Sequence, residues 1–489
     1  LFTRIMIPEA IYALQFTATF YLFLRAWTGS MNKRLGYWGV AVLIALAVLT
    51  RGLIGVVFPL FTIVGFIIAT KSWHRWRELH LFSSTLIFAA IAVPWHVLAE
   101  LRSPGFFWSY FINEHINRAL GTRYPPDYDA VPLFLWWAAH LAWLFPWSVF
   151  LGFAVKQFPH PRTWWSGHML PSAQARLLLF IWAGVILGFF SVLGGSRMEY
   201  YSFGAWPALA IMLGLGLAGA EESRSRWLPR LQGVLAGIGL LIAAVLGYLV
   251  WQSSHLRSTG DISSLLKMHK NSFYRLSMGH LFDLTPQAFA DLRTPALGVA
   301  VLFGIGFALA WVLQWKKRSL AASLAVGLAM AGFMSFANMA LGSFAPRLSS
   351  KTLALEINKY LRPQDKIAIY GEFDPGSSIA FYCNRRVYLY NGRYDNLEFG
   401  SRYPDAPKIF LKDADFSTFW RGPERVFLFV QPELRQQALS RLALLPSDSV
   451  WLLAENGGKQ VFVNQQLAPD QISFAQYLQA HDLKISATR

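Results

Sequence analysis

Long apolar runs, separated by short polar connections, occupy most of the first 341 residues of the chain. A helix needs about 20 predominantly apolar residues to cross a membrane. The stretch at 36–70 is too long for one span and contains a single charge, Arg51, so we divide it at residues 50–52. The pattern then predicts ten membrane-spanning helices, at residues 10–27, 36–50, 53–70, 81–99, 131–155, 177–194, 202–220, 231–251, 296–315 and 319–341.

The pattern changes after about residue 345, where short apolar runs alternate with polar helical segments. Strands are predicted at KIAIY, RVYLY, RVFLFV, SVWLLA and KQVFVN, and helices at KTLALEINKYL, SSIAFYC and ELRQQALSRLALL. Alternation of this kind is typical of a small α/β domain. YGEFDPGSS indicates a turn, and this region contains no glycine-rich phosphate loop. We therefore expect a transmembrane core at 1–344 and an α/β domain at 345–489.

The composition agrees with a membrane protein, because 54% of the residues are hydrophobic and 15% are charged, whereas soluble domains carry about 25% charged residues. The net charge of +17 is unevenly distributed. On one side of the predicted spans fifteen Lys and Arg accompany three acids, and on the other, up to residue 341, eleven accompany nine. Cytoplasmic loops carry an excess of Lys and Arg. The first side is therefore predicted to be cytoplasmic, and no nucleic-acid partner is expected.

This orientation gathers ionisable residues at the outer face. Glu9, Arg51, residues 100–130, residues 195–201 and the tail after residue 342 all lie there. A proton-coupled transporter usually carries ionisable groups at mid-membrane, but the predicted spans contain no Asp, Glu or Lys. Chemistry at the membrane surface is the better hypothesis.

Two outer segments hold candidate residues that also have simpler structural explanations. TRIMIPEAIY puts Glu9 at the start of a helix, where the helix dipole favours an acid in any case. GGSRMEYYSFGAWPAL brings Arg197, Tyr200 and Tyr201 to the mouth of another helix. An aromatic belt with an arginine anchor is the alternative there.

A third segment, FINEHINRAL, lies in a long loop that is rich in aromatic residues. Glu114 and Arg118 are four residues apart, so on a helix they share a face and can pair. His115 lies beside Glu114. The loop suits a helix that lies along the membrane surface, and a routine solvated ion pair is the alternative.

Together these segments resemble the membrane glycosyltransferases of GT-C type that use a polyprenyl-phosphate sugar as donor. The similarity is to the lipid A aminoarabinose transferases and to their relatives among the protein O-mannosyltransferases. The matching motifs are R-x-x-x-P-E at 4–9, L-T-R-G at 49–52, P-W at 94–95, F-x-x-E-H-x-x-R at 111–118 and R-x-x-Y-Y-x-x-x-x-x-P at 197–207. These motifs cover residues 1 to about 220, and the remainder resembles the family only in layout.

The resemblance implies transfer of a sugar from a polyprenyl-phosphate donor to a lipid A-like acceptor. The protein would be a multi-pass protein of the bacterial inner membrane, with its active site and C-terminal domain on the periplasmic side and membrane lipids around its spans. Glu9 is the candidate catalytic acid, at a position where relatives commonly have Asp. The candidate residues for the donor phosphate are Arg51, Arg118, Arg197, Tyr200 and Tyr201.

The resemblance also implies that Glu114 and His115 belong to a donor or metal site, with His115 as the candidate metal ligand. The sequence requires no cofactor, and a divalent metal stays open, because one histidine and one glutamate are too few to define zinc. The single cysteine, Cys383, excludes a Cys-based zinc site and any intrachain disulfide.

Members of the family resemble one another in a first outer loop that carries an essential acid, upstream of anything present here. The resemblance therefore implies an N-terminally truncated chain with about ten of about thirteen helices, which we expect to insert in a membrane without transferring sugar. Two other functions stay open. An enzyme of the same fold could transfer the sugar to a protein acceptor. Alternatively, the chain could be a non-enzymatic polyprenyl-lipid transporter or scaffold.

Overall fold

The computed structural model describes residues 8–126, 130–164, 169–193, 197–198, 200–257, 285–446 and 449–481. The chain divides into two compact units, one formed by residues 1–235 with 310–323 and the other by residues 236–309 with 324–489. The domain boundary predicted after residue 344 stays a prediction.

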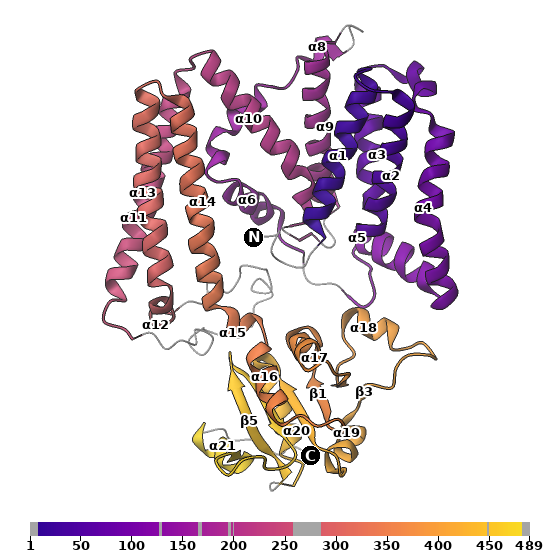
Figure 1. Ribbon diagram of the computed structural model, residues 1–489, viewed down its shortest axis with the longest axis vertical. Coiled ribbons are helices and arrows are strands. Elements are labelled where there is room, and N and C mark those ends of the chain that lie inside the picture. The colour runs from indigo at the N-terminus through magenta and orange to yellow at the C-terminus, as the bar shows by residue number, and fades with distance from the viewer. Residues whose placement is uncertain are drawn as a thin grey trace. The chain divides into compact units, whose positions relative to one another are not determined.

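Helices occupy most of the described residues in all ten segments predicted to span a membrane (Figure 1). These helices are α1 (Glu9–Trp27), α2 (Lys33–Arg51), α3 (Ile54–Ala69), α4 (Leu81–Arg102), α6 (Leu133–Trp143) with η3 (Trp147–Phe150) and α7 (Leu151–Val155), α9 (Pro171–Val192), η4 (Tyr201–Ala205) with α10 (Trp206–Glu222), α11 (Trp227–Gln252), α12 (Pro286–Phe289) with η8 (Ala290–Leu292) and α13 (Arg293–Trp315), and α14 (Ser319–Ser343). Short helices connect them: η1 (Trp73–Leu79), η2 (Trp108–Asn117), α5 (Arg118–Leu120), α8 (Pro161–Trp164) and α15 (Ala345–Leu348).

Within the described residues, seven helices are long and apolar enough to cross a membrane, or up to eight if one bent pair is a single span. The bent pair is the predicted span at 131–155, whose halves meet at 98°. Pro146 lies between them and has no amide hydrogen with which to continue a helix. The division at 50–52 is confirmed, because α2 ends and α3 begins on either side of Gly52. At 16 residues α3 is shorter than a usual span.

Aromatic packing fixes α1 within the first unit. Phe16 contacts Phe58 of α3, with ring centroids 6.4 Å apart. Phe20 contacts Trp182 of α9 at 4.7 Å. These side chains occupy successive turns of one face of α1, and the packing sets the position of Glu9 at the start of the helix.

In the second unit, α13 and α14 pack as neighbours through small residues. A methyl group placed on Gly306 would lie 2.8 Å from Cβ of Ala329, so the two backbones approach closely. Small residues at helix contacts are typical of membrane helices.

The tail forms a seven-stranded sheet in the order β3-β2-β1-β4-β6-β5-β7. The first four strands in this order pair in parallel and the others antiparallel. The strands are β1 (Lys366–Tyr370), β2 (Val387–Tyr390), β3 (Phe410–Leu411), β4 (Val426–Val430), β5 (Trp451–Asn456), β6 (Lys459–Val463) and β7 (Ile472–Ser473). The helices are α16 (Lys351–Tyr360), η9 (Asp374–Gly376), α17 (Ser377–Cys383), α18 (Asp395–Gly400), α19 (Asp413–Arg421), η10 (Pro432–Leu434), α20 (Arg435–Leu442) and α21 (Phe474–Ala480).

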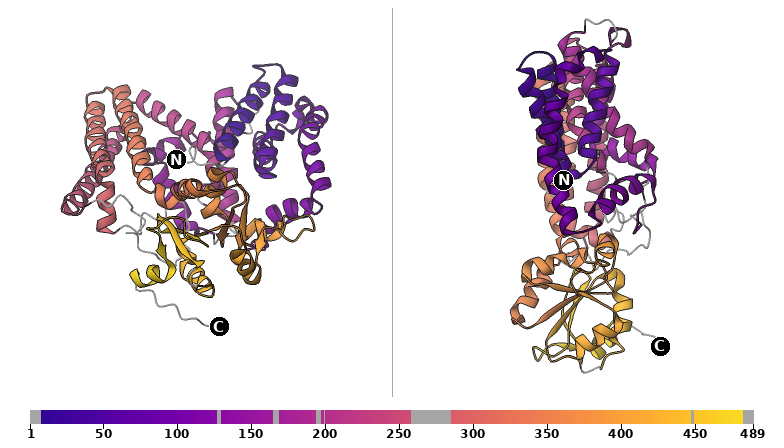
Figure 2. Two further views of the ribbon diagram at one scale, coloured as in Figure 1. Left: turned by 60° about the horizontal axis from the view of Figure 1, so that its bottom comes forward. Right: turned by 90° about the vertical axis from the view of Figure 1, so that its right-hand side faces the viewer.

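Helices cover both faces of this sheet (Figure 2). Side chains alternate along a strand, so Phe427 and Phe429 of β4 pack with α16 and α17. Leu428 and Val430 pack on the other face with α19, α20 and α21. The predicted fold class, a helical membrane protein with a C-terminal α/β domain, is confirmed.

Candidate functional site

The start of α1 meets the end of α2, and this contact brings two predicted site residues together. The guanidinium of Arg51 forms an ion pair with the carboxylate of Glu9, whose side chain is 2% exposed. The ring of Tyr201, at the start of η4, lies beside the guanidinium carbon of Arg51, 5.2 Å from ring centroid to carbon. Tyr200 packs edge-on against Tyr201, with ring centroids 5.1 Å apart. Helix packing thus gathers an acid, a cation and two aromatic rings from three segments.

The turn after Arg51 requires glycine. Gly52 has φ of 80° and ψ of −155°, which an L side chain rarely adopts. A methyl group there would also collide with the imidazole of His115. The next amide, that of Leu53, donates to Nε2 of His115 at 3.0 Å. The L-T-R-G motif therefore fixes a turn that holds His115.

His115 itself is neutral and fully engaged. Its Nδ1 bonds to the carbonyl oxygen of Tyr110 and so carries the hydrogen, while Nε2 accepts from the amide of Leu53. Burial lowers the pKa of His115, which favours this neutral form. Both nitrogens thus hold backbone groups, and neither offers a lone pair to a metal.

The other residues that the structure describes do not support a metal site either. They contain no group of three or more His, Cys, Asp or Glu side chains placed to hold an ion. Glu114 is instead engaged by two arginines: Arg123 Nε at 2.9 Å and a terminal nitrogen of Arg118 at 3.3 Å. The predicted Glu114–Arg118 pair is therefore present. The pair between Glu114 and Arg123 was not predicted; the side chain of Arg123 is buried and also donates to the carbonyl of Pro125.

Arg197, which is predicted to bind the donor phosphate, donates hydrogen bonds to three backbone carbonyls. Its Nε donates to the carbonyl of Phe190 at 2.6 Å, and its two terminal nitrogens donate to those of Val131 at 3.0 Å and Ser191 at 3.3 Å. Two of these carbonyls lie in the last turn of α9, where helical partners are missing and a cation is favoured. Arg197 is 8% exposed, and in this structure it stabilises the end of α9.

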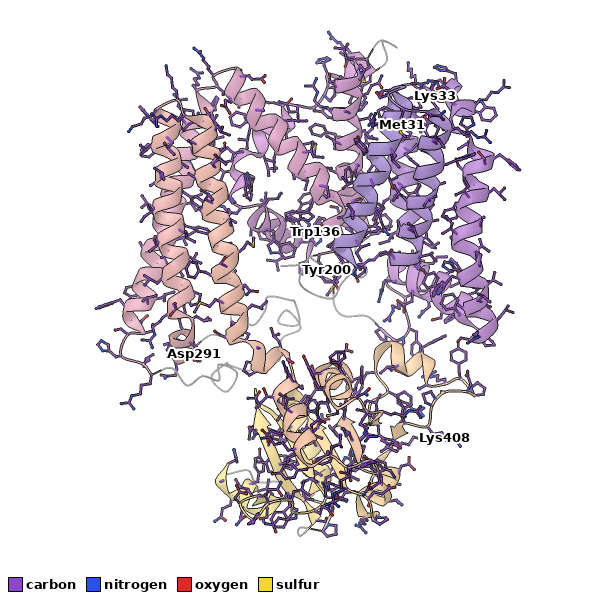
Figure 3. The ribbon with its side chains drawn as sticks, viewed as in Figure 1. Met31, Lys33, Trp136, Tyr200, Asp291 and Lys408 are labelled. Atoms are coloured by element: carbon purple, nitrogen blue, oxygen red, sulfur yellow. The ribbon has the colours of Figure 1, made fainter. Side chains whose placement is uncertain are left out.

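The segment after Arg197 is held by α6. Trp136 Nε1 donates to the carbonyl of Met198 at 3.2 Å, and His140 bonds to the hydroxyl of Ser202. Figure 3 labels Trp136 of α6 and Tyr200, which precedes η4. Residues 4 and 199, which belong to the quoted motifs, lie outside the described residues.

The structure therefore joins Glu9, Arg51, Tyr200 and Tyr201 directly, and connects His115 to them through the turn at 52–53. Glu114 and Arg118 follow along η2 and α5. His115 is held by the backbone amide of Leu53 and the carbonyl of Tyr110. Backbone groups are present at nearly every residue, so the sequence does not show which of them bind His115. The glycine after Arg51 was the one local signal of that turn.

No family model matches the chain. It is 25% identical over 402 residues to the undecaprenyl phosphate-alpha-4-amino-4-deoxy-L-arabinose arabinosyl transferase of Erwinia tasmaniensis, which covers 81% of this chain. It is 26% identical over 345 residues to the protein of that description from Enterobacter sp., which covers 59% of this chain. The chain spans 64% and 58% of the length of these two relatives.

Two solved structures share the fold. ArnT from Cupriavidus metallidurans bound to undecaprenyl phosphate superposes with a TM-score of 0.69 at 21% identity, over 94% of this chain and 75% of that one. Its apo form gives 0.66 at 22% identity, over 94% and 74%. The predicted resemblance is confirmed: this chain is a multi-pass membrane protein with the fold of ArnT, a GT-C glycosyltransferase, and its sequence is similar to the undecaprenyl-phosphate aminoarabinose transferases.

Proposed function

We propose that the protein transfers a sugar from a polyprenyl-phosphate donor to a lipid A-like acceptor at the periplasmic face of the inner membrane. The observation that carries the proposal is the similarity over 81% of the chain to an arabinosyl transferase that is named for such a donor. The contacts among Glu9, Arg51 and Tyr201 support it, because they form a compact polar group where the membrane-spanning helices end.

The reaction breaks the bond between C1 of the sugar and a phosphate oxygen, and an acceptor oxygen forms the new bond to C1. The phosphate leaves with the bonding electrons, so cations must stabilise its growing charge. Arg51 is the first candidate, with Tyr201 beside its guanidinium. Arg118, whose side chain is 30% exposed, is the second. The contacts of Arg197 make it a positioning residue in this proposal.

Glu9 has one of two roles, depending on the acceptor. A hydroxyl acceptor needs a base for its proton, and a carboxylate can supply it. A lipid phosphate is already ionised, so Glu9 would then only orient it. Because a buried ion pair such as Glu9–Arg51 is costly to break whatever its function, variants must be judged by kinetics and by protein level together.

The test measures transfer by the full-length protein in native membranes with a polyprenyl-phosphate aminoarabinose donor. Glu9→Gln is expected to lower kcat more than it changes the donor KM. Arg51→Gln is expected to raise the donor KM roughly ten- to hundredfold, because a hydrogen bond to a charged group contributes about 1.5–3 kcal/mol. Arg25→Gln, at the other end of α1, is the control. Wild-type kinetics in both site variants, at unchanged protein level, would contradict the proposal.

The acceptor is tested separately. Mass spectrometry of a deletion strain is expected to show a sugar missing from lipid A and unchanged protein glycans. A missing protein glycan would instead identify protein as the acceptor. If purified full-length protein transfers no sugar from the donor to either class of acceptor, the transporter or scaffold hypothesis replaces the enzyme.

A further inference from the structure

Helices α16 and α17 pack side by side on one face of the tail sheet, and their outer side carries an unusual surface. Their inner side chains, among them Leu353, Ile357 and Ile379, are fully buried. Outward, Phe381 is 77% exposed and Leu355 is 49% exposed. We define the α16–α17 surface as the exposed residues Lys351, Leu355, Phe381, Tyr382, Arg385 and Arg386.

The aromatic residues of this surface are held in place. Asn358 of α16 donates to the carbonyl of Tyr382 at 3.0 Å, which ties the two helices together. Lys351 Nζ lies 5.2 Å from the ring centroid of Tyr382, and the rings of Phe381 and Tyr382 meet edge-on at 5.1 Å. Exposed aromatic rings fixed by such contacts are ready to bind without further ordering.

The charge of the surface is positive. Glu356, the acid of α16, is paired with Lys359 at 2.6 Å. Lys351, Arg385 and Arg386 then supply the charge that the surface presents. Aromatic rings beside Lys and Arg are the composition of a protein surface at the membrane interface.

The chain also keeps this surface near a membrane. Helix α14 is apolar enough to span and ends at Ser343, and α16 begins at Lys351. Four of the residues between them form α15. At about 1.5 Å per helical residue and about 3.5 Å per extended residue, Lys351 lies within roughly 20 Å of the end of α14. The headgroup region begins where the apolar part of α14 ends.

We propose that the α16–α17 surface docks on the headgroups of the membrane that contains α14, with Phe381 and Tyr382 in the interface and the three cations against anionic phospholipid. Juxtamembrane Lys and Arg are attracted to anionic lipid, and the attraction is lost at high salt. The proposal concerns how the tail sits on the bilayer and does not depend on the proposed function.

The experiment uses the whole chain in nanodiscs of phosphatidylcholine, with or without phosphatidylglycerol. In a Cys383→Ala background, an environment-sensitive dye is attached at Thr352→Cys, three residues before Leu355 and on its side of α16. A matched dye at Gln437→Cys reports from α20, on the opposite face of the sheet. Quenching by headgroup-labelled lipid is expected to be at least twofold stronger at 352 than at 437, and to require phosphatidylglycerol.

The double variant Arg385→Gln/Arg386→Gln, or Phe381→Ser, is expected to reduce quenching at 352 to the level in phosphatidylcholine alone, as is 1 M salt. Lys408→Gln/Arg421→Gln removes two exposed charges elsewhere in the tail and is expected to change nothing. Equal quenching at 352 and 437, or quenching at 352 that ignores lipid charge and the variants, would overturn the proposal. If the dye at 352 is shielded from solvent in detergent without lipid as strongly as in the nanodiscs, the proposal is also overturned, because the surface would then contact protein.

Discussion

At the scale of single residues, the turn at Gly52 decides whether the candidate site forms. Glycine is needed there twice, for its backbone conformation and because a methyl group would collide with His115. Gly29 offers a matched comparison, since its φ is also positive at 76° but a methyl group placed on it would meet no atom within 4 Å. Gly29 therefore serves as a control position with positive φ and without the collision.

We expect Gly52→Ala to destabilise the protein by about 2–4 kcal/mol, from backbone strain of about 1–3 kcal/mol and a disturbed hydrogen bond to His115 of about 1 kcal/mol. Gly29→Ala should cost only about 1 kcal/mol. Thermal unfolding in detergent compares the two variants. Equal shifts of the midpoint would show that the contact with His115 contributes nothing.

His115 predicts how stability depends on pH. Burial lowers its pKa from the ordinary value of 6.5, so the unfolded chain binds a proton there more readily than the folded one. Stability from this group is therefore full above about pH 6.5 and is lost as the pH falls toward the folded pKa. We expect the thermal unfolding midpoint to be lower at pH 5.5 than at pH 8. The decrease should be smaller in His115→Gln. An identical pH dependence in the variant would remove His115 as the cause.

At the scale of elements, the end of α9 depends on a side chain from outside the helix. Arg197 reaches carbonyls of α9 and that of Val131, and it joins two segments that are far apart in sequence. A lysine keeps the charge but has one nitrogen and cannot reach three carbonyls. The two roles considered for Arg197, fold stabilisation and phosphate binding, therefore make different predictions.

We expect Arg197→Lys to lower the unfolding midpoint clearly, with a loss of about 2–4 kcal/mol for hydrogen bonds from a charged donor. In the variant protein that remains folded, the donor KM should stay within about threefold of the wild-type value. A threefold change corresponds to well under the 1.4 kcal/mol that a tenfold change requires, so it would not indicate a lost contact with phosphate. Thermal unfolding and donor titration are measured on the same preparation. An unchanged midpoint with a tenfold higher KM would return Arg197 to the phosphate site.

The helices and strands also show how much of the secondary structure can be predicted from the sequence. Strand KIAIY and helix SSIAFYC match β1 and α17 residue for residue, because a short apolar run and an apolar pair four residues apart are local signals. Strands β3 and β7 have two residues each and are too short to show a period. Helix α19 was missed, although Phe416 and Trp420 are buried four residues apart on it. The seat of His115 could not be predicted, because it consists of backbone groups brought together only by folding.

At the scale of the whole molecule, two charged clusters mark opposite ends of the first unit. Lys33 starts α2 and Arg51 ends it, and 19 helical residues span about 28 Å, close to the thickness of a bilayer core. Lys33 and Tyr200 accordingly lie at opposite ends of these helices in Figure 3. At the Lys33 end, Glu78 bonds to Lys33 and Arg75, and the bond from Arg75 lowers the pKa of Glu78 to about 2. Glu78 therefore stays ionised across the physiological pH range.

The distribution of Lys and Arg predicts which end faces the cytoplasm, and labelling can test it. Cys383 cannot report, because its side chain is buried and burial raises the pKa of its thiol to about 11. In a Cys383→Ala background we introduce Lys408→Cys in the tail or His74→Cys in the η1 connection, both at exposed positions.

The positive-inside rule places His74 in the cytoplasm. The predicted spans between the two positions are odd in number, which places Lys408 outside provided that the bent pair α6–α7 crosses the membrane once. An impermeant maleimide is expected to label Lys408→Cys in intact spheroplasts and His74→Cys only after detergent is added. Label on both in intact spheroplasts would show that α6–α7 or another predicted span does not cross.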